Sequence, residues 1–174
     1  MVAWFLFGAM CILVILLVLA YFKFASLNKQ VKKAWQELDH QLKFRTELIP
    51  SVALSAASLP ELERDFVYQL SSLKEPKQQK TILKERVAYE TQLTQALQKV
   101  FEAVKKHPEL TTDEHFTKLQ TSVMQSEKKI QAAKKKYNSA AHTFNIITTV
   151  IPLNLIAKVF EMNPYDYFDF DSSL

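Results

Sequence analysis

The sequence predicts an all-α protein, in which an N-terminal transmembrane helix is followed by an antiparallel bundle of long helices and a short C-terminal helix. Three observations predict this class. The chain opens with an uncharged run, Val2 to Phe22. Through most of the remainder, apolar residues recur at spacings of three and four, as on the buried stripe of a helix. The only glycine is Gly8, and tight β-hairpin turns favour glycine.

The uncharged run predicts a membrane anchor over residues 1–23. A helix of this length reaches about 32 Å, which is enough to cross the hydrocarbon core of a bilayer. A cleaved signal peptide is the alternative. However, no basic residue precedes the run, the run is longer than an ordinary signal-peptide core, and a cut after Ala20 matches a cleavage site poorly. We therefore expect an uncleaved anchor.

Basic residues follow the anchor closely, whereas only the first methionine precedes it. They are Lys23, Lys29, Lys32 and Lys33. Because basic flanks stay in the cytoplasm, this asymmetry predicts an outside N-terminus and a cytoplasmic C-terminal domain. We expect the four lysines to face anionic lipid head groups. The net charge of +4 suits that role, and it also suits an ordinary solvated helical surface.

Residues 27–162 are expected to form one helical bundle. The seam of its first helix comprises Val31, Trp35, Leu38, Leu42, Ile49, Val52 and Ala56, with Arg45 in one seam position. No helix breaker separates Phe22 from Ile49, so anchor and first helix are expected to be nearly continuous, with a joint at Ser26 or Asn28 if they are separate. Pro50 predicts a kink. Ser58 and Glu61 have the spacing of a capping box, which predicts a new helix there.

Two further helices and a short one are expected after Pro76. The first ends at His107-Pro108, and a capping box of Thr111 and Glu114 starts the next. The seam of that last long helix is Phe116, Leu119, Val123, Ser126, Ile130, Ala133, Tyr137, Ala140, Phe144 and Ile147. Pro152 ends it, and an apolar segment over residues 155–160 predicts the short helix.

The tail over residues 163–174 alternates aromatic with acidic side chains. Two interpretations are open for it. Its rings can pack back on the bundle, or the tail can serve as a docking peptide for a partner. The alternation is also typical of a strand, but one strand without a partner is not stable.

The residues expected to carry helix packing or an interaction surface are Val31, Trp35, Leu38, Asp39, Gln41, Leu42, Arg45, Val123, Ile130, Tyr137, Asn138, Phe144 and Asn145. The polar members are expected to form hydrogen bonds between helices, which fix the register of the bundle. A functional surface patch is the alternative for them.

The sequence offers no credible site for chemistry. No glycine follows the anchor, which excludes phosphate-binding loops, and a single cysteine excludes thiolate metal clusters. The histidines, His40, His107, His115 and His142, have no metal-ligand spacing. The basic run at Lys134 lacks arginine and interleaved aromatics, so no nucleic-acid partner is expected. We predict a protein that is not an enzyme and that holds no cofactor or metal.

Several stretches resemble the LemA family. The resemblance rests on Leu27-Asn28, Val31, Ala34-Trp35, Leu38-Asp39, Gln41-Leu42-Lys43, Arg45 and Leu48-Ile49-Pro50, then on His107-Pro108-Glu109-Leu110, Phe116, Leu119-Gln120, Glu127, Ile130, Ala133, Tyr137-Asn138, Phe144-Asn145, Pro152 and Asn154-Leu155-Ile156-Ala157. The chain departs from the family pattern at Ser51 (usually Asn), Phe144 (Tyr), Ile151 (Phe) and Glu161-Met162 (Gly-Phe), and Leu59-Pro60 breaks a helix that normally runs on.

The resemblance implies a bacterial inner-membrane protein with a cytoplasmic bundle of long antiparallel helices, but no particular reaction. One branch resembles proteins that shape membranes, and some members lie near membrane zinc proteases in their genomes. We therefore expect a non-enzymatic scaffold or adaptor that contacts membrane lipid, forms a homo-oligomer and binds a membrane-protein partner. The alternatives are an oligomeric membrane-remodelling protein and an accessory subunit of a membrane protease.

Overall fold

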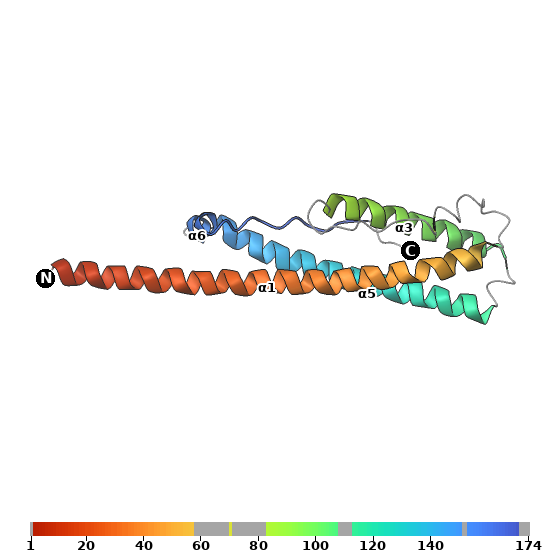
Figure 1. Cartoon of the computed structure of the whole chain (residues 1–174), viewed down its shortest axis with the longest axis horizontal. Coiled ribbons are helices and arrows are strands. Elements are labelled where there is room, and N and C mark those ends of the chain that lie inside the picture. The colour runs from red at the N-terminus through yellow and green to blue at the C-terminus, as the bar shows by residue number, and fades with distance from the viewer. Residues whose placement is uncertain (1, 58–69, 71–82, 108–112, 151–152, 171–174) are drawn as a thin grey trace. The chain divides into compact units, whose positions relative to one another are not determined.

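A computed structural model describes residues 2–57, 70, 83–107, 113–150 and 153–170. Within these ranges the chain forms four helices and no strand, namely α1 (Val2–Ala56), α3 (Leu83–Val104), α5 (Glu114–Thr149) and α6 (Leu153–Val159) (Figure 1). The all-α class is confirmed. The helix start predicted at Ser58 and the breaks predicted at Pro76 and Pro152 lie outside the described residues.

α1 is a single helix of 55 residues that joins the uncharged run to the first seam of the bundle. It has no joint at Ser26 or Asn28, because nothing in this stretch opposes a helix. Pro50 lies inside α1, which continues to Ala56. The apolar window of α1 has a mean hydropathy of 2.8 and is 0% buried, so α1 is long and apolar enough to be a candidate membrane span.

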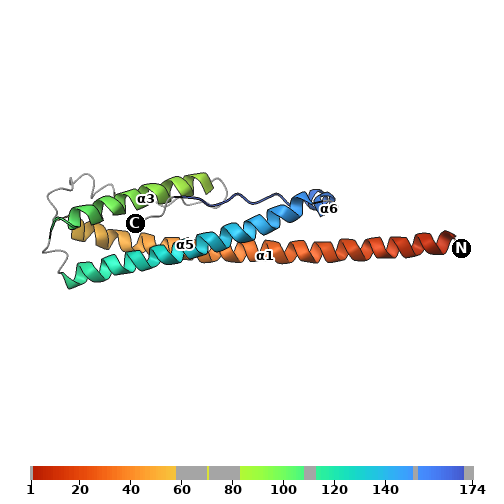
Figure 2. The ribbon, with the colours of Figure 1, turned by 180° about the vertical axis from the view of Figure 1, so that it is seen from behind.

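The chain divides into two compact units. The first unit comprises Met1–Gln36 with Lys136–Tyr167, and the second comprises Glu37–Lys135 with Phe168–Leu174. In the first unit α5 runs antiparallel to α1 (Figures 1 and 2). The rings of Phe24 and Phe144 lie 6.1 Å apart between centroids, and those of Trp35 and Tyr137 lie 5.3 Å apart. α6 then brings the ring of Phe160 to 5.3 Å from that of Tyr21.

The second unit contains a hydrophobic core. In it α3 runs in the same direction as α1, and α5 runs opposite to both (Figure 2). The core is formed by Ile49, Val52, Ala53, Ala56, Leu70, Tyr89, Leu93, Ala96, Leu97, Val100, Phe101, Ala103, Val104, Phe116, Leu119 and Val123. The helix predicted to end at His107 is α3, and its apolar residues Tyr89, Leu93, Leu97, Val100 and Val104 are buried.

Two seam residues named from the sequence are less buried than the alanine beside them. On α1 the buried residue is Ala34, whereas Trp35 is only half-buried; on α5 it is Ala141, whereas Ala140 is only half-buried. A residue three or four positions after the previous seam residue lies near the apolar stripe in either case. Spacing alone therefore does not decide which of two adjacent residues is the more buried.

The capping residue of α5 also differs from the expected one. Asp113 stands directly before the helix, and its Oδ2 accepts a hydrogen bond of 2.9 Å from the backbone N–H of Phe116. This is the contact of an N-cap with the third helical residue. The cap predicted at Thr111 is therefore wrong by two residues, because an aspartate nearer to the apolar stripe provides the acceptor.

α6 ends in a Schellman motif that lacks its usual glycine. The N–H of Met162 donates to the carbonyl of Ala157 at 2.8 Å, and the N–H of Glu161 donates to that of Lys158 at 3.2 Å. This pattern places the first residue after the helix end, here Glu161, in the left-handed region. Glu161 has a φ of 50°, although a side chain is disfavoured there. The departure from Gly-Phe noted in the sequence is therefore a departure at a position that favours glycine.

Replacing Glu161 by glycine should stabilise the chain. We expect Glu161→Gly to raise the free energy of unfolding by about 1 kcal/mol, because glycine adopts the left-handed conformation without steric cost. Urea unfolding of the full-length protein in mild detergent measures the change. Glu161→Ala is the matched control, since it removes the same charge but keeps the strain, and an equal gain in both variants would contradict the explanation.

Trp35 should contribute less to stability than a residue of the core. Its ring is half-buried and packs edge-on against Tyr137. We expect Trp35→Ala to lower the free energy of unfolding by about 2 kcal/mol, below the ~3–5 kcal/mol typical of a fully buried aromatic. Urea unfolding followed by circular dichroism measures the loss. A loss under about 1 kcal/mol would mean that the contact with Tyr137 is not maintained in solution.

Candidate functional site

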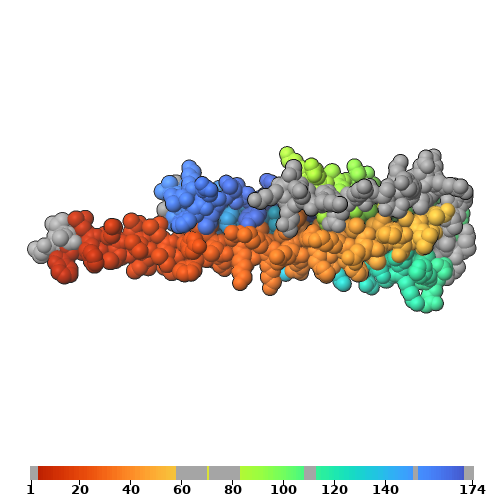
Figure 3. All heavy atoms as spheres, in the orientation of Figure 1, coloured from red at the N-terminus to blue at the C-terminus, as the bar shows by residue number. Residues whose placement is uncertain are grey.

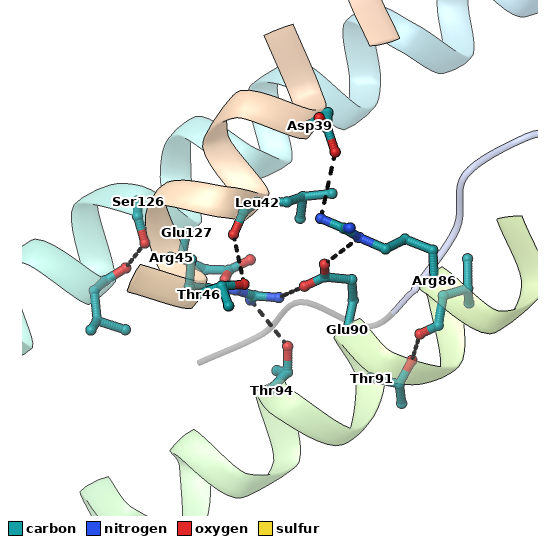
Figure 4. Close-up of polar contacts among 12 residues, drawn as sticks. Asp39, Leu42, Arg45, Thr46, Arg86, Glu90, Thr91, Thr94, Ser126 and Glu127 are labelled. Carbon is teal, nitrogen blue, oxygen red and sulfur yellow. Dashed lines mark hydrogen bonds and ion pairs between the residues drawn. The ribbon is translucent and has the colours of Figure 1, made fainter. Parts of the chain in front are cut away.

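The most unusual polar group in the described residues is Arg45, which is 0% exposed on the seam of α1. Its Nη2 pairs with Glu90 of α3. Its Nη1 donates to Glu127 of α5 at 2.6 Å and to the hydroxyl of Thr94 at 3.2 Å (Figure 4). One side chain thus binds both of the other long helices of the second unit. The planar guanidinium suits this role, since its donors point in several fixed directions.

A second arginine extends the cluster. The Nε of Arg86 donates to the other oxygen of Glu90 at 2.8 Å, and its Nη2 lies 3.6 Å from Asp39. Asp39 also pairs with Lys43 at 2.6 Å, nearer to the surface. Three cations and three carboxylates therefore lie in one connected set, which we call the Arg45 cluster. It comprises Asp39, Lys43, Arg45, Arg86, Glu90 and Glu127.

Glu90 receives both arginines, and its environment acts on it in two opposite ways. Burial raises the pKa of this carboxyl, since a charged group is costly away from water. The guanidinium groups of Arg45 and Arg86 act against that rise. The charge of Glu90 therefore depends on its two cationic partners, and the cluster is stable only when it is complete.

The acidic aromatic tail covers the Arg45 cluster in the second unit. Phe170 is buried, and its ring centroid lies 5.7 Å from the guanidinium carbon of Arg45 and 4.9 Å from Nζ of Lys134. The same Nζ donates to the carbonyl of Phe170 at 2.8 Å. Phe168 is fully buried beside it. Cations on the faces of an aromatic ring are attracted by its quadrupole, so the ring suits a site between two of them.

In the first unit the tail is held by two side chains of α5. The amide of Asn145 both donates to the carbonyl and accepts from the N–H of Tyr165, each at 2.8 Å. The hydroxyl of Tyr137 donates to the carbonyl of Asp166 at 2.8 Å. Of the two interpretations of the tail, the structure thus shows the one in which its rings pack back on the bundle.

The burial of Tyr137 leads to a pH-dependent stability. Burial, then the neighbouring Tyr165 and Asp166, raises the pKa of Tyr137 from 10.0 to about 12. The folded state therefore favours the neutral phenol, and this contribution is complete below pH 10 and lost as the pH rises towards 12. We expect the wild type to lose about 2 kcal/mol more than Tyr137→Phe over that range. Urea unfolding at a series of pH values measures it, and parallel curves would contradict it.

The structure places the residues singled out in the sequence as follows. The buried ones are Val31, Leu38, Leu42, Arg45, Val123, Ile130, Tyr137 and Phe144, and the half-buried ones are Trp35, Asp39, Gln41, Asn138 and Asn145. Lys23, Lys29, Lys32 and Lys33 are exposed. The structure brings Asp39 and Arg45 into one cluster, whereas Asn145 binds the tail instead of another helix.

Sequence reasoning missed the partners of Arg45. Arg86 and Glu90 are i, i+4 on the buried face of α3, and Glu127 follows Ser126 in the seam of α5. A signal was present, because an arginine on an apolar seam requires carboxylates on the facing helices. The spacing along one helix cannot tell which carboxylates these are.

In the Arg45 cluster the cations and the carboxylates neutralise one another. Its central charged groups are buried and bind one another, with no nucleophile among them. Within the described residues, no group of three or more His, Cys, Asp or Glu side chains is placed to hold a metal ion. The arrangement can fix the register of three helices, because only one alignment pairs all of its charges.

One comparison with known proteins gives a match. The model of the LemA family matches residues 34–173, which include the second part of α1 but not the uncharged run. A comparison with curated proteins gives no match. The match covers most of the chain and includes α3, α5, α6 and the tail that covers the Arg45 cluster. The chain therefore belongs to the LemA family.

Proposed function

We propose that this chain is a single-pass protein of the bacterial inner membrane whose cytoplasmic bundle serves as a non-enzymatic scaffold or adaptor. The observation that carries the proposal is the continuity of α1. Within the described residues, the apolar window of its first part is 0% buried, and its second part is packed into the bundle. One uninterrupted helix therefore couples the candidate membrane span to the bundle.

Two features favour a structural role over a catalytic one. The charged residues at the centre of the Arg45 cluster are buried and bind each other, which leaves them poorly placed to act on a substrate. The LemA family is not a known enzyme family. A scaffold needs a rigid surface rather than an accessible reactive group. The Arg45 cluster and the packed tail both contribute to a rigid bundle.

Mild crosslinking in native membranes tests the scaffold. The full-length protein is crosslinked, purified and examined by mass spectrometry for what accompanies it. We expect a homo-oligomer together with a membrane-protein partner near stoichiometric amounts. The matched control replaces residues 2–22 by an unrelated apolar segment of equal length, and the partner should be retained because the bundle binds it. Recovery of monomers alone in both cases would contradict the proposal.

The proposed orientation can be measured separately. Ser139 lies exposed on α5, and Cys11 is the only natural cysteine. In a Cys11→Ala background, a membrane-impermeant maleimide should label Ser139→Cys only after the cells are broken. Labelling in intact cells, under conditions where a cytoplasmic marker stays unlabelled, would reverse the orientation.

Membrane remodelling is a second candidate, supported by the exposure of all four lysines that follow the uncharged run. A basic face beside a membrane span attracts anionic lipid. Reconstitution at increasing protein density into anionic vesicles tests it, with Lys29, Lys32 and Lys33 all changed to Gln as the control. Vesicle diameters that fall with density for the wild type, but not for the control, support remodelling, and unchanged diameters in both exclude it.

A further inference from the structure

α6 exposes an apolar surface that is unusual for so short an element. Leu155 and Val159 of α6 are 60% and 77% exposed, and Phe160, which directly follows α6, is 49% exposed, whereas Ile156 and Ala157 are buried. We call the three exposed side chains the α6 patch. Large apolar side chains that lie together on a surface generally mark a contact with a partner or a membrane.

The α6 patch lies where the uncharged run ends. The ring of Phe160 contacts that of Tyr21, which is followed by Phe22 and then by Lys23. On the same part of α1, Ala20 and Phe24 are buried, so α6 and the end of α5 pack closely here. Figure 3 shows the red part of α1 uncovered up to the blue segment that lies beside it. If α1 spans a bilayer, the bilayer surface on the side of the bundle lies near Tyr21 and Phe22.

The direction of α6 is the one expected of a helix that lies along the membrane surface. α6 is bent by 99° from α5, which itself lies along α1 in the first unit. In Figure 1, where α1 lies in the plane of the picture, α6 is seen nearly end-on. α6 therefore lies across the axis of α1, which is along the surface of a membrane that α1 crosses. Lys158 is exposed on the same helix, and a long lysine side chain can reach lipid phosphates.

We propose that α6 is an interfacial helix, which inserts Leu155, Val159 and Phe160 into the lipid surface as a second membrane contact. The proposal rests on the proposed membrane anchoring by α1. Lipid is the occupant because the patch continues the exposed apolar surface of Tyr21 and Phe22, which the anchor presents to the bilayer. Short elements that lie in the interface bind through buried apolar area together with basic residues.

Spin labels in the full-length protein test this proposal. In the Cys11→Ala background, single cysteines replace Val159, Ile15 and Ser139, which represent the α6 patch, the anchor and a water-exposed control. Ser139 is near Tyr137, which contacts Trp35, about 20 Å along α1 from Phe22. Each labelled protein is reconstituted into vesicles of phosphatidylethanolamine and phosphatidylglycerol, and collision rates with oxygen and with a water-soluble nickel complex are compared.

We expect oxygen collisions to exceed nickel collisions several-fold at Val159 and Ile15, and the reverse at Ser139. A lipid-exposed label at Ile15 with a water-exposed label at Val159 would overturn the interfacial helix while leaving the anchor intact. A water-exposed label at Ile15 would overturn the anchor and the proposed function with it. Dipolar broadening at Val159 without oxygen access would also overturn the proposal, since the patch would then face a second copy of the chain.

Discussion

Arg45→Ala should lower the free energy of unfolding by about 3–5 kcal/mol, because it leaves Glu90 and Glu127 buried without their shared cation. Arg45 also holds down the pKa of Glu90, so its loss should raise that pKa further. Once protonated, Glu90 is neutral and needs no cation beside it. The loss in free energy of unfolding caused by Arg45→Ala should therefore shrink as the pH falls through the pKa of Glu90. Urea unfolding in mild detergent at mildly alkaline and mildly acidic pH measures both effects.

Two controls separate the buried pair from ion pairs in general. Lys118 pairs with Glu114 at i, i+4 on the exposed surface, and Lys118→Ala should cost at most about 0.5 kcal/mol. A quadruple variant with Arg45→Met, Arg86→Met, Glu90→Leu and Glu127→Leu should recover most of the stability, since it leaves no buried charge unpaired and apolar groups of similar size need no partner. A loss below about 1 kcal/mol for Arg45→Ala would mean that water reaches the cluster.

Phe144→Ala should cost about 3–5 kcal/mol, which is the expected range for a buried aromatic residue. Phe144 is 2% exposed, and its ring lies between Phe24 of α1 and Tyr165 of the tail, at 6.1 and 5.1 Å. The variant therefore loosens both the contact of α5 with α1 and the attachment of the tail. Urea unfolding measures the loss, and limited proteolysis after Tyr165 and Tyr167 measures the release of the tail.

Phe44 provides the matched control for Phe144. It lies on α1 and is 41% exposed, so Phe44→Ala should cost less than about 1 kcal/mol and leave the tail protected. Similar losses at the two positions would contradict the packing described here. Loss of stability without faster proteolysis of the tail would mean that Asn145 and Tyr137 hold the tail without Phe144.

The helices were predictable from the sequence because their signals are local. An uncharged run, a repeated spacing of apolar residues and a few prolines determine where helices can form, and α1, α5 and α6 lie where these signals place them. The choice of Ala34 over Trp35 was not predictable in the same way. It depends on how closely a neighbouring helix approaches, and small side chains permit the closest approach.

The Arg45 cluster shows where sequence reasoning reached its end. Arg45 was recognisable as an exception on an apolar seam, and hydrogen bonds between helices were the expected consequence. Its partners Glu90 and Glu127 are 45 and 82 residues away along the chain. Their identity depends on the alignment of three helices, which no spacing within one helix encodes. The tail is similar, since Phe170 finds its place only once Arg45 and Lys134 are brought together.

The central claim is that the apolar first part of α1 stays on the protein and holds the bundle at a membrane. The intact mass of the protein extracted from native membranes after an alkaline wash tests it most directly. We expect the full chain of about 20.1 kDa, residues 2–22 included, in the membrane fraction. A shorter chain that begins near Tyr21 and is found in the soluble fraction would contradict the claim, because the uncharged run would then be a cleaved signal peptide.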